Sequence, residues 1–265
     1  MNIYIQELKM SVSSAIYWTI GMLSTMLLFM LMFPAISTDA AIMQQIVSKF
    51  PPEFTKALGL TTLDLSVVTG FYGFLFMYIL LIGSVFAMKS GISVLSEEVR
   101  AKTADFLVAK PVTRTTIVTA KLMSVLTNIL SQNIIYIIGA FIVANLVADQ
   151  SFDQGIFLLI NISLLFVQLF FVAFGLFLSV VIKKIKTVLP IALGTVFGFF
   201  VLQMLNQSLA DAKLAYITPF AYYDVSQIIE TSGYDLGYLA VNWILIIVFT
   251  SLTYFIFNKK DMPSV

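Results

Sequence analysis

One stretch of the chain interleaves charges of both signs with apolar residues. It runs from Ser96 to Lys121 and reads SEEVRAKTADFLVAKPVTRTTIVTAK. Its Glu97 and Glu98 are the only adjacent pair of acids in the sequence, and adjacent residues on a helix point about 100° apart. The two carboxyl groups are therefore not placed to share a proton, and a hydrated turn or surface explains them better than acid–base catalysis.

The residue types that are missing exclude several kinds of chemistry. Cysteine and histidine are both absent, which excludes disulfides, thiolate metal sites, haem ligation through His and nucleophile–base pairs that use either residue. The sequence contains neither a G-x-x-x-x-G-K-[ST] phosphate loop nor a G-x-S-x-G nucleophile turn. We therefore expect no enzyme, no metal site and no cofactor bound by this chain.

The composition indicates a membrane protein. Hydrophobic residues make up 60% and charged residues 11% of the 265 residues, against a usual charged share of about 25%. A spanning helix needs about 20 apolar residues, and six uncharged runs have at least 22 each. The first run is too long for the core of a signal peptide, so it counts as a span. The six expected transmembrane helices are 15–36, 66–88, 122–147, 155–182, 187–210 and 236–258. The sequence thus predicts an all-α integral membrane protein with a single domain, 1–265.

The distribution of Lys and Arg predicts the orientation. With a cytoplasmic N-terminus, 12 basic residues lie in inside segments and 3 lie outside, whereas the acids divide as 5 inside and 9 outside. Basic residues concentrate on the cytoplasmic side of membrane proteins. Both termini and the 96–121 stretch are therefore expected in the cytoplasm.

Three further segments have patterns of their own. The N-terminal MNIYIQELKMSVSS is weakly amphipathic, which predicts a short interfacial helix in the membrane plane. The external segment 37–65 contains apolar residues at four-residue spacing before Pro51, which suggests another interfacial helix. The external segment 211–235 is too aromatic for a solvated loop and too polar to span, so it lies at the interface or dips back against the bundle.

A few polar residues interrupt the expected spans. Asn128 and Gln132 are four apart in the third span, and Asn161 and Gln168 are seven apart in the fourth, so each pair lies near one helical face. A polar side chain in a bilayer faces a partner helix or a hydrated path. Both interpretations remain open: hydrogen bonds between helices, or the lining of a substrate path.

The 96–121 stretch resembles the signature between the second and third spans of ABC-2 type permeases. In that signature a Glu precedes a Gly-Thr pair, paired leucines, a P-x-x-R and a Gly-Lys that enters the third helix. The matching residues here are Glu98, Thr103, Phe106, Leu107, Pro111, Arg114 and Lys121, within 26 residues. The sequence departs from the signature at Lys102 and Ala120, where Gly is usual.

The resemblance implies that this stretch forms a coupling helix that docks in a groove of a separate ATPase subunit. It implies a role in coupling for Glu98, Arg100, Thr103, Phe106, Leu107, Pro111, Arg114 and Lys121. Phe106 and Leu107 suit the apolar anchors of such an interface and the charged residues its rim. Pro111 would end the helix, since proline removes a backbone donor.

The function implied by the resemblance is that of a permease subunit in the plasma membrane of a bacterium. Its partners would be an ABC ATPase that holds ATP and Mg²⁺, a second permease copy or paralogue, and the bilayer, with no nucleic acid. Spans without charges favour an amphipathic substrate, first of all a toxin or antimicrobial peptide. The alternatives are a permease for lipid-linked, drug or ion cargo, and a non-transporting membrane partner that transmits ATPase motion to an external protein or sensor.

Overall fold

A computed structural model describes residues 3–38, 47–60, 62–101, 113–148, 151–182, 184–209 and 212–259. Within these ranges every regular element is a helix, and six helical segments are long and apolar enough to cross a membrane. They are α1 (Ile3–Met30) together with α2 (Phe33–Thr38), α5 (Val68–Ala101), α7 (Arg114–Val147), α8 (Gln154–Val181), α9 (Leu189–Leu209) and α12 (Leu236–Lys259). The prediction of an all-α protein with six spans is confirmed.

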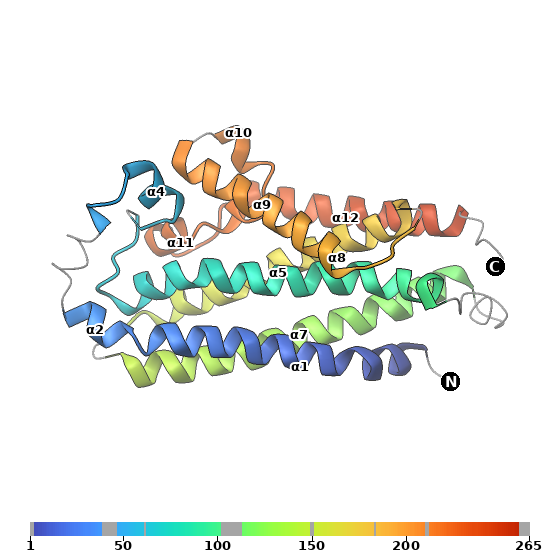
Figure 1. Ribbon diagram of the computed structural model, residues 1–265, viewed down its shortest axis with the longest axis horizontal. Coiled ribbons are helices and arrows are strands. Elements are labelled where there is room, and N and C mark those ends of the chain that lie inside the picture. The colour runs from blue at the N-terminus through green and yellow to red at the C-terminus, as the bar shows by residue number, and fades with distance from the viewer. Residues whose placement is uncertain are drawn as a thin grey trace.

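The long helices run roughly along a common direction, except for α9, which is inclined to the others (Figure 1). The start of α1, the end of α5, the start of α7 and the end of α12 lie at one end of the bundle, which we call the terminus end. The short helices α4 (Pro52–Ala57), α10 (Ala212–Ala215) and α11 (Val225–Thr231) gather at the opposite end (Figure 1). The stretch between α5 and α7 therefore begins and ends beside both the first and the last helix.

The central pair of helices is α5 and α8, which are the most buried of the six. Their backbones approach closely at two glycines: a Cβ on Gly91 would lie 2.5 Å from the carbonyl oxygen of Val172, and one on Gly175 would lie 2.7 Å from that of Met88. Any side chain at either position would collide with backbone atoms. These two glycines set the α5–α8 distance on which the interior depends.

The N-terminal segment differs from the separate in-plane helix that the sequence analysis expects. Residues 3–30 form one continuous helix, α1, because neither Gly nor Pro occurs before Gly21. Ser11 stays helical by donating to the carbonyl of Glu7 at 2.7 Å. At 1.5 Å per residue, the 28 residues of α1 measure about 42 Å, more than the roughly 30 Å of a hydrocarbon core. The polar first turns thus extend the first span into the terminus end.

Residues 212–235, in a segment that the sequence predicts to be external, pack back against the bundle, one of the two possibilities that the composition left open. Tyr222 and Tyr223 in the 3₁₀ turn η1 (Ala221–Tyr223) are buried, and the Tyr223 hydroxyl accepts a hydrogen bond from Asn242 of α12 at 3.0 Å. Tyr234 donates to the carbonyl of Leu159 in α8 at 2.6 Å. Packing against the bundle explains why this segment is rich in aromatic residues.

In the segment 37–65, the described short helix is α4, which begins at Pro52, after the apolar residues that suggested a helix. Of those residues, Ile42 and Ile46 lie outside the described residues. Proline suits this first helical position because its missing N–H would have no partner there.

Aspartates cap three helices that begin at the opposite end. Asp153 accepts hydrogen bonds from the first backbone N–H groups of α8, and Asp224 does so for α11. Asp235 accepts from the backbone N–H groups of Tyr238 and Gly237 at the start of α12, and these bonds hold the pKa of its carboxyl below the usual value. These acids have a structural role as N-caps.

Candidate coupling site and polar interior

The candidate coupling stretch lies between α5 and α7 at the terminus end. Residues 102–112 lie outside the described residues and include Thr103, Phe106, Leu107 and Pro111. Glu98 and Arg100 belong to the last turns of α5, so the helix of the second span continues into the stretch. The described structure therefore supplies the two flanks between which a docking segment must lie.

The return flank begins at a defined helix start. Thr113 is the N-cap of α7, and its hydroxyl accepts a hydrogen bond from the backbone N–H of Thr116 at 3.2 Å. Such a cap satisfies one of the N–H groups that lack partners at a helix start. The helix α7 thus begins at Arg114, which is the last residue of the P-x-x-R motif.

Arg114 links this start to the end of α12. Its Nη1 donates to the carbonyl oxygen of Asn258 at 3.3 Å and lies 3.5 Å from that of Phe257. The last carbonyls of a helix lack partners within the helix and attract positive charge. Thr119 and Tyr254 add a hydroxyl–hydroxyl bond of 2.8 Å between the same two helices.

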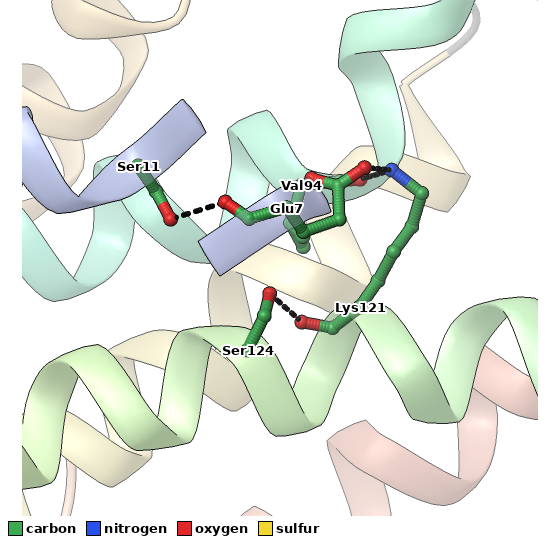
Figure 2. A network of polar contacts seen from close by, with 5 residues as sticks. All are labelled: Glu7, Ser11, Val94, Lys121 and Ser124. Carbon is green, nitrogen blue, oxygen red and sulfur yellow. Dashed lines mark hydrogen bonds and ion pairs between the residues drawn. The ribbon is translucent and has the colours of Figure 1, made fainter. Parts of the chain in front are cut away.

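Lys121 joins three helices instead of pointing to solvent. Its side chain is 1% exposed, and its Nζ donates to Glu7 Oε1 of α1 at 2.6 Å and to the carbonyl of Val94 in α5 at 2.8 Å. Figure 2 shows the ammonium group meeting both acceptors, with Ser124 bonded to the carbonyl of Lys121. We call Glu7, Lys121 and the carbonyl of Val94 the α1–α5–α7 tie.

The two flanks of the stretch are thus fastened to their neighbours by named bonds. The tie connects α1, α5 and α7, and Arg114 connects α7 to α12. Four of the six long helices are therefore connected near the place where residues 102–112 leave and rejoin the bundle. Such an arrangement can pass a displacement of that segment to most of the bundle.

Deeper in the bundle, Gln168 of α8 is the centre of a second polar group. Its Nε2 donates to Gln132 Oε1 at 2.9 Å and to the carbonyl of Gly83 at 3.1 Å, and its Oε1 accepts from Asn133 Nδ2 at 2.6 Å. All three amide side chains are buried. The group joins α5, α7 and α8. Each of these bonds stabilises the bundle, because a polar atom buried in an apolar setting without a hydrogen bond costs free energy.

A third polar group joins the same helices nearer the opposite end. The Tyr72 hydroxyl donates to Asn161 Oδ1 at 2.7 Å and lies 3.0 Å from the Tyr136 hydroxyl. Asn161 also donates to the carbonyl of Phe157 at 2.7 Å. Within the described part of the chain, no group of three or more acidic side chains could hold a metal ion. The two interior groups that the structure describes are thus hydrogen-bonded amides and tyrosines.

Comparison with known protein families gives the identity of the fold. The model of the ABC-2 family transporter proteins matches residues 1–262. The chain belongs to the ABC-2 transporter family. None of the curated proteins matches it significantly. As a member, this ABC-2 chain is a multi-pass membrane subunit of a transporter, a subunit that is generally not catalytic itself, and the family implies an ABC ATPase as its partner.

The residues proposed for the substrate path of this ABC-2 chain lie in different surroundings. Gln132, Asn161 and Gln168 are at most 1% exposed and bonded between or within helices. Asn128 donates to Ser11 Oγ of α1 at 2.7 Å and lines a cavity near the terminus end. Hydrogen bonding between helices, one of the two roles that the sequence left open, accounts for the observed contacts, and a path role stays a prediction.

Sequence reasoning missed four residues of these groups: Glu7, Tyr72, Tyr136 and Asn133, the last of which bonds Gln168. Glu7 is the charged partner of Lys121, and the only signal for it was an acid within the first turns of an apolar segment. Tyr72 and Tyr136 bond Asn161 or each other, but nothing in the sequence separates them from the other 9 of the 11 tyrosines.

Proposed function

We propose that this chain is the permease subunit of an ABC exporter, coupled through the 96–121 stretch to a separate ATPase. The observation that carries the proposal is the set of bonds at the flanks of the stretch, where Lys121 and Arg114 fasten α7 to three other long helices. A segment docked on an ATPase at this place would act on four helices at once.

In the proposed mechanism, the ATPase supplies the energy and this chain the movement. ATP and Mg²⁺ are bound by the ATPase, and Phe106 and Leu107 anchor the docked segment with Glu98 and Arg100 at its rim. Pro111 ends the docked segment before α7 begins. Closure of the ATPase subunits displaces the segment, and α5 and α7 act as levers because their helices continue directly into it.

We further propose that two permease copies, or this chain and a paralogue, form the transport unit. Gly194 and Gly198 of α9 support this, because a Cβ built on either would meet no atom of this chain within 4 Å. Small residues at four-residue spacing allow a second helix to approach closely in a membrane. The face of α9 that carries them is open to such a partner.

The proposed cargo is an amphipathic peptide, with a toxin or antimicrobial peptide as the first candidate and a bacterial plasma membrane as the setting. The deep polar groups of the interior are amides and tyrosines, not charges. A fixed unpaired charge would bind or repel such a cargo strongly, whereas amides exchange hydrogen bonds with it.

The cargo proposal predicts peptide-stimulated ATP hydrolysis. The chain and its ATPase, reconstituted together in nanodiscs, should hydrolyse ATP several-fold faster when a synthetic amphipathic helical peptide of Leu and Lys is added. A scrambled peptide of the same composition, without an apolar face, is the matched control and should leave the rate unchanged. Stimulation by a drug or lipid-linked sugar but not by the peptide would refute the peptide proposal, and no stimulation by any cargo would favour the non-transporting alternative.

The orientation that this mechanism needs is testable because the chain contains no cysteine. Single cysteines at Ser151 and Ser232, both exposed near helix starts at the opposite end, should react with a membrane-impermeant thiol reagent added to intact cells. A cysteine at Thr187, exposed between α8 and α9, should react only after the cells are opened. Ser96 is a poor reporter of the cytoplasmic side, since it is 6% exposed. Labelling of Thr187→Cys in intact cells would place the ATPase site on the wrong side of the membrane.

A further inference from the structure

A polar cavity lies between α1, α5 and α7 at the terminus end, beside the tie. Its volume is about 290 Å³, and its wall includes Glu7, Ser11, Val94 and Ser124, which Figure 2 shows, together with Lys89 and Glu97. At about 30 Å³ per water molecule, this volume equals that of roughly ten waters. The cavity is therefore large enough for a small polar group with more than one charge.

Two opposite charges face this cavity without touching each other. Lys89 Nζ donates to Ser14 Oγ at 2.7 Å, and the charges of Lys89 and Glu97 interact through space. Among the described residues, however, the ion pair of Lys121 and Glu7 is the one salt bridge within 4.0 Å, and no hydrogen bond to the Glu97 carboxylate occurs. Glu7 is thus already neutralised by Lys121, whereas the contacts between described residues give neither Lys89 nor Glu97 an ion-pair partner.

The cavity lies near one end of the candidate membrane span of α5. Glu97 is the last residue of the membrane-spanning part of α5, Val68–Glu97, and Lys89 lies about two turns before it. Met10, which also lines the cavity, is 56% exposed, and Phe86 and Val125 add apolar surface to the wall. The cavity therefore combines apolar surface with two opposite charges, as a zwitterionic phospholipid does.

We propose that the cavity binds the headgroup of an amine-bearing zwitterionic phospholipid, with the phosphate on Lys89 and the ammonium on Glu97. Partly buried charges without a counter-ion in direct contact are costly, and a ligand that carries both opposite charges offsets both. A primary ammonium donates hydrogen bonds to a carboxylate, as a lysine does, whereas a choline has no N–H to donate. An anionic headgroup such as phosphatidylglycerol would leave Glu97 without a cation and facing a phosphate. This site depends on neither the ATPase nor the cargo proposed above.

Lipid retention in native mass spectrometry tests the site. The full chain, purified in detergent, receives equal amounts of phosphatidylethanolamine, phosphatidylcholine and phosphatidylglycerol with identical acyl chains. We expect about tenfold preferential retention of phosphatidylethanolamine, the size expected for one charge-assisted hydrogen bond. Lys89→Met and Glu97→Gln should each remove the preference, and Ser93→Phe, which fills the cavity and leaves both charges, should do so as well.

Two control variants test whether the loss of preference is specific to charges that line the cavity. Lys9→Met and Glu53→Gln change exposed charges that do not line the cavity and should retain the preference. Equal retention of the three lipids by the natural chain, or an unchanged preference in Ser93→Phe, would overturn the proposal. Soluble O-phosphoethanolamine that stabilises the chain against heat as well as the lipid does would contradict a lipid site and indicate a soluble zwitterion instead.

Discussion

Glu7→Ala should lower the free energy of unfolding by about 3–5 kcal/mol, the cost measured when one partner of a buried ion pair is removed. The reason is the position of Lys121, which is 1% exposed and would lose the 2.6 Å ion pair with Glu7. The carbonyl of Val94 remains as an acceptor, but it does not neutralise the charge. Unfolding of the purified chain in mixed micelles, followed by helix content against added denaturing detergent, measures the effect.

The two partners of this ion pair should respond unequally. Glu7 is 15% exposed and lines the polar cavity, so water can reach its carboxylate when Lys121→Met removes the ammonium. We therefore expect Lys121→Met to destabilise less than Glu7→Ala. The double variant should recover much of the loss, because it removes both charges of the ion pair together.

Lys9→Met is the control for this series, since Lys9 is an exposed cation on the same helix. It should shift the unfolding transition by no more than about 0.5 kcal/mol. Additive losses in the double variant, or a loss from Glu7→Ala no larger than that from Lys9→Met, would show that the tie does not hold α1, α5 and α7 together.

Six helices were predictable because each uncharged run is long enough to cross a bilayer and every backbone group in a bilayer must bond within its own segment. The ends of the helices were not. The polar first turns of α1 suggested an in-plane helix, yet the salt bridge from Glu7 to Lys121, 114 residues away, holds them in line with the first span. A bond between such distant residues leaves no trace in local periodicity.

The candidate site was predictable to a similar degree. Resemblance to a family signature singled out Arg114 and Lys121. It did not indicate that Arg114 reaches the last turn of α12 or that Lys121 is buried. Residue spacing predicted which face of its helix carries Gln132 and which carries Gln168. It did not predict that the two side chains bond each other, because that depends on how α7 and α8 pack. Packing distance in turn depends on glycines such as Gly91, whose role a single sequence does not reveal.

The second large effect is expected at the proposed ATPase interface. Phe106→Asp and Leu107→Asp should each weaken ATPase binding by about 2 kcal/mol or more, and the double variant by at least about 100-fold, since buried apolar anchors dominate protein interfaces and a carboxylate there would be buried without a partner. Insertion and stability of the chain should be unchanged, because the described bonds that hold α5 and α7 involve neither residue. Arg114 is a less clean target, since its contact with the end of α12 would be lost as well.

Co-purification of an ABC ATPase with the tagged chain tests the central claim most directly. Membranes that express the natural chain, the double variant Phe106→Asp and Leu107→Asp, or the control Phe50→Asp at the opposite end are solubilised gently. Proteins that carry a G-x-x-x-x-G-K-[ST] motif are then quantified by mass spectrometry per mole of recovered chain. We predict a stoichiometric ATPase with the natural chain and with Phe50→Asp, and none with the double variant. An equal yield of the ATPase from all three would contradict coupling through this stretch.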